Sequence, residues 1–232
     1  MQNSTTVKFT STNPGRLLLL VSSMLLAACT TSTAQVSNNK AATTTTIAAN
    51  AASVSQLDLD DPRDFEEAIR GLIASPEDLQ IPSIADPTKY VWDTKEYNFI
   101  KGEAPNSVNP SLWRQAKLNN IKGLFEFRPG IYQLRGFDLS NMTLIKGDTG
   151  WIVVDPLTSK ETAKYAYDFA MKHLVERYPD MPKSISAVLL THSHMDHFGG
   201  TLGIISQEEI EKNNIPVIAP LGFMEEATSE NI

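Results

Sequence analysis

The chain has 232 residues, of which 41% are hydrophobic and 20% are charged, a composition that excludes a wholly disordered protein and suits one domain with appendages. The formal net charge of −7 and the absence of any run of Lys and Arg exclude a surface that follows a phosphate backbone, so no nucleic-acid partner is expected. The single cysteine, Cys29, excludes an intrachain disulfide.

The N-terminus predicts export. Lys8 and Arg16 supply positive charge, and residues 17–26 are a mostly apolar run too short to span a bilayer. The run ends in Leu26-Ala27-Ala28-Cys29, which resembles a bacterial lipobox. We therefore expect residues 1–28 to be a lipoprotein signal peptide and Cys29 to be the lipidation site, which would anchor the protein to a bacterial membrane, facing the periplasm or the outside. The alternative is an ordinary signal peptide followed by a chance cysteine.

Two further segments precede the main pattern. Residues 29–56 are rich in Thr, Ala and Ser and nearly lack large apolar residues, so they are predicted to form a disordered tether. Residues 57–120 are predicted to form an N-terminal helical or irregular extension interrupted by prolines. Helices are expected at residues 64–70 and after Asn109, which would cap a helix that has Pro110 at its first position.

Residues 121–232 begin with two predicted β-hairpins. The first joins strands at 124–127 and 131–135, and the second joins strands at 141–146 and 151–154. Both connections contain glycine, which favours a tight turn between paired strands.

Strands and helices then alternate. A helix is predicted to begin with a capping box between Thr158 and Glu161, and another is predicted to begin at Ser206. Apolar strands are expected at 185–190 and 215–219. This order predicts an α/β protein that contains half of a two-layered sheet core with helices outside.

The segment after the strand at 185–190 predicts a metal site. It reads Thr191-His192-Ser193-His194-Met195-Asp196-His197 and is followed by Gly199-Gly200. Imidazole and carboxylate are ligands of Zn²⁺, although they also suit Mn²⁺ and Fe²⁺. His192 and His194 can share one ion, and Asp196 and His197 can point to a second. Two ions can activate water, and Asp196 could also orient that water during catalysis.

The fourth histidine, His173, lies in the helix predicted after Thr158 and is not expected to be a ligand. Each ligating histidine needs a hydrogen-bond acceptor at its second ring nitrogen, and the sequence does not show which groups supply it.

The metal motif resembles that of the metallo-β-lactamase superfamily. Five longer blocks are similar to the alkyl sulfatase branch, and they lie at residues 108–116, 130–143, 147–158, 191–200 and 219–225. The resemblance implies an αββα sandwich, two Zn²⁺ ions and hydrolysis of linear primary alkyl sulfates to alcohol and sulfate. It assigns His192 and His194 to one zinc and Asp196 and His197 to the other, and it implies a homodimer for the intact enzyme.

In that branch, further acidic ligands, a last histidine and the sulfate-binding residues come from regions after this motif. We therefore expect only the N-terminal half of the catalytic fold at residues 121–232, a truncated or partial enzyme, and weak or no catalysis. The alternatives are another hydrolase of the same fold, such as a β-lactamase or thioesterase, and a non-catalytic truncated surface lipoprotein.

Overall fold

The computed structural model describes residues 41–180 and 183–231. The predicted signal peptide, Cys29 and the first part of the predicted tether lie outside these residues. One compact unit spans Ala42–Ile232. Within the described ranges, no helix is both long enough and apolar enough to cross a membrane.

Helix α1 (Thr44–Val54) occupies a segment that we predicted to be disordered, and the tether prediction is wrong for these residues. The segment contains several alanines, which have the highest helix propensity. The Thr43 hydroxyl accepts a hydrogen bond from the Thr46 amide at 3.1 Å, which caps the first turn. None of the α1 side chains is buried, so the composition correctly excluded a contribution to the core.

The helices expected between residues 57 and 120 are present. They are α2 (Arg63–Ala68) and α3 (Pro110–Asn119), and the short 3₁₀ helix η1 (Thr94–Tyr97) lies between them. The Asn109 side chain accepts from the Ser111 amide at 2.9 Å, which confirms the predicted cap. The Arg114 guanidinium binds Asp64 at 2.7 Å and thereby joins α3 to α2.

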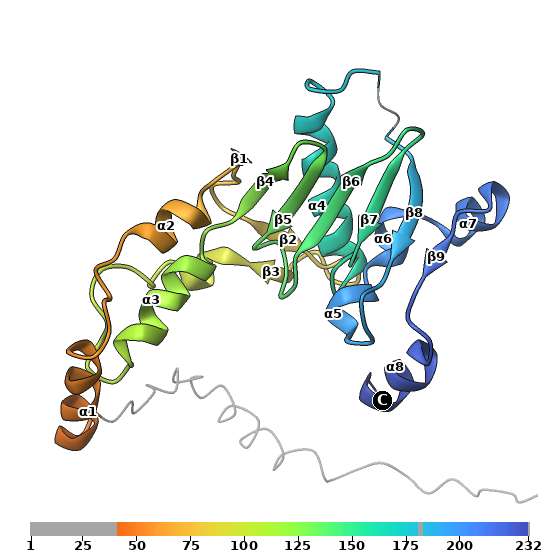
Figure 1. The fold of residues 1–232 in the computed structure, drawn as a ribbon. Coiled ribbons are helices and arrows are strands. Elements are labelled where there is room, and N and C mark those ends of the chain that lie inside the picture. Colours follow the sequence, from red (N-terminus) through yellow and green to blue (C-terminus); the bar gives the residue numbers. More distant parts are fainter. Residues whose placement is uncertain (1–40, 181–182, 232) are drawn as a thin grey trace, which may run out of the picture. The chain divides into compact units, whose positions relative to one another are not determined.

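A mixed seven-stranded sheet has the order β1-β4-β5-β6-β7-β8-β9, and β2 pairs with β3 in a separate two-stranded sheet (Figure 1). The strands are β1 (Leu72–Ala74), β2 (Gln80–Pro82), β3 (Tyr90–Asp93), β4 (Gly123–Arg128), β5 (Ile131–Arg135), β6 (Met142–Lys146), β7 (Trp151–Val154), β8 (Ile185–Leu189) and β9 (Val217–Ile218). The pairs β4–β5 and β6–β7 are antiparallel, which confirms both hairpins.

The sheet turns parallel after β7, because helix α4 (Lys160–Leu174) carries the chain back before β8 begins. In the β7–β8 register, Val154 pairs with Leu189, so both strands end at the same edge of the sheet. Strand β9 pairs with β8 in the same direction. This edge receives Asp155 after β7 and the predicted metal motif after β8.

The core lies between one face of the sheet and α4, which Figure 1 draws behind the strands. Along β5, β6 and β7, buried residues alternate with half-buried or exposed ones, as expected for strands with one covered face. The covered side chains include Tyr132, Leu134, Leu144, Trp151 and Val153 from the sheet and Ala163, Ala166, Ala170 and Leu174 from α4. The described residues thus form the sheet-and-helix half of the predicted αββα sandwich.

The 57–120 segment packs against this core. Strand β1 pairs with β4 at the sheet edge. The Ile84 amide donates to the Glu161 carboxylate on α4 at 3.1 Å, and this hydrogen bond holds the pKa of Glu161 below its ordinary value. The Trp92 indole donates to the Gly136 carbonyl at 2.9 Å.

The remaining helices follow β8 in the chain. They are α5 (Met195–Phe198), α6 (Thr201–Ile204), α7 (Gln207–Asn213) and α8 (Phe223–Asn231). The capping box at Ser206 is confirmed. The capping box of α4 begins at Ser159 and not at Thr158, because the Thr158 hydroxyl already donates to Asp138 at 2.7 Å. Helix α8 was not predicted.

Candidate metal centre

The structure brings all four predicted ligands together at the C-terminal end of β8. His192 lies in the loop after the strand, His194 is the N-cap of α5, and Asp196 and His197 lie in the single turn of that helix. The ring centroids of His192 and His194 are 4.7 Å apart, and those of His192 and His197 are 4.0 Å apart. His173 instead packs against Phe169 on α4, with 4.7 Å between ring centroids.

Potential donor atoms of the four side chains lie close together in two pairs. His192 Nε2 lies 3.2 Å from His194 Nδ1, and His197 Nε2 lies 3.3 Å from Asp196 Oδ2. Two ligands of one tetrahedral Zn²⁺ ion, each at its usual bond length, are also about 3.3 Å apart. Each pair therefore fits two neighbouring positions on one ion. In the described part of the chain, no three or more His, Cys, Asp or Glu side chains are grouped so that they could hold a metal ion.

Asp155, at the end of β7, supports both pairs and was missed by the sequence analysis. It is 7% exposed, and its Oδ1 accepts from the Thr191 amide at 2.8 Å. Its Oδ2 accepts from the Thr191 hydroxyl at 2.7 Å and lies 2.9 Å from His197 Nδ1. The available signal was positional: a carboxylate follows the strand that runs parallel to β8, and parallel strands place their C-terminal ends at one edge.

This network sets the tautomers of two histidines. An ionised Asp155 carboxylate accepts hydrogen bonds but cannot donate them. His197 Nδ1 must therefore carry the hydrogen of this bond, which leaves the lone pair on His197 Nε2 available. The Thr191 hydroxyl donates a hydrogen bond to Asp155, so its oxygen is free to accept one from His192 Nδ1, 2.9 Å away. The Nε2 lone pair of His192 is then available as well. Both lone pairs belong to the atoms that form the two donor pairs.

The turn after β7 is strained and is hydrogen-bonded to the residue that follows α5. Asp155 and Leu157 have positive φ angles of 54° and 63°, a conformation that side-chain-bearing residues seldom adopt. The Leu157 carbonyl accepts from the Gly200 amide at 2.8 Å, which fixes the chain just after α5. A Cβ atom on Gly200 would overlap the Pro156 carbonyl oxygen, so only glycine permits this close approach.

The loop between β5 and β6 also holds the motif. The Ser140 hydroxyl donates to the Asp196 carbonyl. Asp138, which is 7% exposed, accepts from the Thr158 amide at 3.1 Å and from the Leu139 amide at 2.6 Å. These contacts link the backbone of a predicted ligand to the turn that follows β7.

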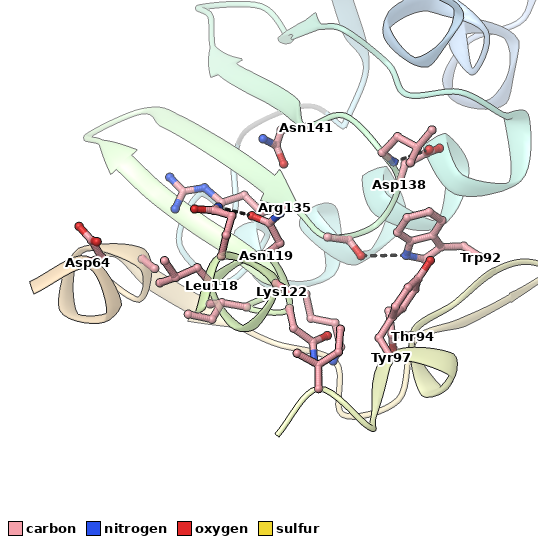
Figure 2. Close-up of a pocket in the computed structure, with 18 of the residues that line it drawn as sticks. Asp64, Trp92, Thr94, Tyr97, Leu118, Asn119, Lys122, Arg135, Asp138 and Asn141 are labelled. Carbon is pink, nitrogen blue, oxygen red and sulfur yellow. Dashed lines mark hydrogen bonds between the residues drawn. The ribbon is translucent and has the colours of Figure 1, made fainter. Parts of the chain in front are cut away.

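A cavity of about 880 Å³ opens beside this loop (Figure 2). None of the four predicted ligands lines it, although Leu139 and Asn141, the neighbours of Ser140, do. Trp92 is one of its aromatic walls, and Arg135 lies in its lining with a pKa that burial lowers from the ordinary arginine value. The cavity is therefore a neighbour of the metal motif rather than its centre.

Residues 135–230, which include β6 to β9 and the whole motif, match the family model of the metallo-β-lactamase superfamily. The matched segment contains the four predicted ligands and both pairs of donor atoms.

Longer matches extend beyond residues 135–230. A linear primary-alkylsulfatase from Pseudomonas sp. is 45% identical over 192 residues, which are 80% of this chain and 27% of that protein. An alkyl/aryl-sulfatase from Saccharomyces cerevisiae is 43% identical over 80% of this chain and 28% of its own length. The structure of the stereoselective inverting sec-alkylsulfatase Pisa1 from Pseudomonas sp. is similar with a TM-score of 0.73 and 46% identity, over 83% of this chain and 29% of that one. The chain thus resembles alkylsulfatases over little more than a quarter of their length.

Proposed function

We propose that this chain contributes to a metal-dependent hydrolase of alkyl sulfate esters. The observation that carries the proposal is the pairing of His192 with His194 and of Asp196 with His197, within a chain that is 43% to 47% identical to three alkylsulfatases over the matched region. The substrates would be linear primary alkyl sulfates, and the reaction would consume water and yield an alcohol and sulfate. The three relatives give no support to a β-lactamase, a thioesterase or a non-catalytic lipoprotein.

The proposed cofactor is Zn²⁺ in two sites, one held by His192 and His194 and the other by Asp196 and His197. Bound zinc would supply a water of lowered pKa and would polarise the sulfate group. The chain's own residues then do the following work. Asp155 keeps His197 and, through Thr191, His192 in the tautomers that expose Nε2. Asp196 would ligate one zinc and would orient the attacking water, and the Ser140 hydroxyl donates to its backbone carbonyl.

We also propose that the protein is exported and attached to a bacterial membrane through lipid on Cys29, and that the complete enzyme is a homodimer. The first proposal is supported by the lipobox-like sequence at residues 26–29, and the second by the resemblance to alkyl sulfatases. An exported enzyme would meet detergent-like sulfates outside the cytoplasm.

A substrate panel with metal removal tests the function. We expect the complete gene product to release sulfate from dodecyl sulfate and to leave a β-lactam and a thioester unchanged. Chelation should lower the rate by at least about 100-fold, and Zn²⁺ should restore it better than Mn²⁺ or Fe²⁺, because the site would lose its source of activated water. Hydrolysis of the β-lactam without sulfate release, or full activity after chelation, would contradict the proposal.

The role of Asp155 gives a second test. We expect Asp155→Asn to raise the Kd for Zn²⁺ by about 10- to 100-fold. An amide nitrogen facing Thr191 and His197 could not accept the hydrogen bonds that the Asp155 carboxylate accepts from them. Isothermal titration of the metal-free protein measures the change. Asp168→Asn removes the same charge from an exposed site on α4, where Asp168 binds Lys164 at 2.8 Å, and should leave the Kd unchanged. Equal Kd values for the two variants would refute the role of Asp155.

A further inference from the structure

The cavity of about 880 Å³ beside the β5–β6 loop has an apolar part that three segments of the chain build together. Trp92 comes from β3, Ile100 follows η1, and Leu118 lies near the end of α3. All three side chains are half-buried. Figure 2 shows Trp92 with Tyr97 on one side of the cavity, and Leu118 and Arg135 on the other. A volume of this size is typical of sites for small molecules, and this lining favours a ligand with an apolar part.

Two cations lie where the β4–β5 hairpin borders the cavity. The strand register pairs Gly123 with Arg135, and Lys122 precedes Gly123 in the chain. Lys122 and Arg135 are both half-buried, and both line the cavity. The Arg135 guanidinium lies over the Phe125 ring, 4.4 Å from its centroid, and its Nε donates to Gln133 at 2.6 Å. These two contacts hold the guanidinium in place through its face and its Nε, and they do not use its terminal nitrogens.

The carboxylates that line the cavity already have partners. Asp64 binds Arg114 at 2.7 Å, and Glu67 binds Arg70. Asp138 accepts hydrogen bonds from two backbone amides and two threonine hydroxyls. The negative charge at the cavity is therefore balanced by groups of the protein itself.

The two cations are not balanced in the same way. Within residues 41–180 and 183–231, neither Lys122 nor Arg135 forms an ion pair. Burial lowers the pKa of Arg135, and no neighbouring carboxylate opposes that effect. A half-buried cation without a counter-charge is costly, so an anion at this end of the cavity would be stabilised.

We propose that this cavity binds an anionic amphiphile, with its charged head at Arg135 and Lys122 and its alkyl chain along Trp92, Ile100 and Leu118. A guanidinium can donate two parallel hydrogen bonds to a head group with several oxygens, such as a sulfate or a sulfonate. None of the four predicted metal ligands lines the cavity, so this site is separate from the metal centre. The inference goes beyond the proposed function, because it concerns a second site at which no bond is cleaved.

Binding of octyl sulfonate to the complete gene product tests the inference, with Arg135→Gln as the first variant and Lys122→Gln as the second. A sulfonate has a carbon–sulfur bond in place of the ester, so sulfate ester hydrolysis cannot consume the probe. Isothermal titration gives the Kd, and circular dichroism checks that each variant is folded. Arg128→Gln is the matched control, because Arg128 is the exposed last residue of β4 and does not line the cavity. His197→Ala is the second control, because it alters the metal motif and leaves the cavity intact.

We expect Arg135→Gln to raise the Kd for octyl sulfonate by at least about 10-fold and Lys122→Gln to raise it by a smaller factor, while both controls leave it unchanged. Butyl sulfonate should bind the unaltered protein at least about 10-fold more weakly than octyl sulfonate, because fewer methylene groups are buried.

Three results overturn the inference. The first is the absence of binding, as would occur if another part of the complete gene product fills the cavity. The second is an unchanged Kd in folded Arg135→Gln and Lys122→Gln, or equal Kd values for the two sulfonates. The third is a loss of binding in His197→Ala, which would place the probe at the metal centre. None of these measurements depends on sulfate release, so a failure of the proposed function is distinguished from a failure of this inference.

Discussion

Replacing His197 by alanine is expected to abolish metal-dependent sulfate release. His197 Nε2 forms one of the two donor pairs with Asp196 Oδ2, and His197 Nδ1 donates a hydrogen bond to Asp155. The substitution therefore removes a proposed metal ligand and also leaves the Asp155 carboxylate, 7% exposed, with one hydrogen-bond partner fewer. Loss of an outer partner of a ligand costs about 10- to 100-fold in affinity or activity, and loss of the ligand itself should cost more than about 100-fold.

The matched control is His173→Ala, since His173 is the histidine outside the motif and packs on α4. It should retain activity and metal content. Steady-state rates with dodecyl sulfate and the bound zinc per chain measure both variants, and circular dichroism checks that each is folded. Full activity in folded His197→Ala, or an equal loss in His173→Ala, would show that the motif does not act as proposed.

Gly200→Ala is expected to destabilise the fold by about 3 kcal/mol or more. The added Cβ would overlap the Pro156 carbonyl oxygen and lie 2.6 Å from the Ala163 Cβ on α4. Neither neighbour can move easily, because Pro156 belongs to the turn with positive φ angles and Ala163 is fully buried. The Gly200 amide also donates to the Leu157 carbonyl at 2.8 Å, so a shift of the backbone would break that bond.

Urea denaturation of the 232-residue chain, followed by circular dichroism, measures the change in unfolding free energy. Gly102→Ala is the control: Gly102 has a φ of 65° but no atom within 4 Å of the added Cβ, so it reports backbone strain without overlap. Its cost should be about 1–2 kcal/mol. A Gly200→Ala variant as stable as Gly102→Ala would mean that the turn after β7 is not tightly packed against α6.

Local sequence signals predicted most of the elements that carry the site. Glycine between alternating strands gave both hairpins, and the apolar run at 185–190 gave β8. These sequence signals gave the wrong helix start where another contact occupied the predicted capping residue, and they missed two helices. The capping box moved from Thr158 to Ser159 because Asp138 binds the Thr158 hydroxyl, and α1 formed where low complexity indicated a tether. Helix α8 has few buried side chains of its own, and its apolar contact is made with Phe198 in another helix.

The sequence alone was enough to predict that four potential ligands lie close together. Side chains so near in sequence must also be near in space, and they are His192, His194, Asp196 and His197. Only the tertiary structure decided what holds them. Asp155 comes from a different strand and meets the motif because β7 and β8 run parallel and end at one edge. Hydrogen-bond partners distant in sequence leave no periodic pattern along the chain, since the distance between them is set by how the elements pack.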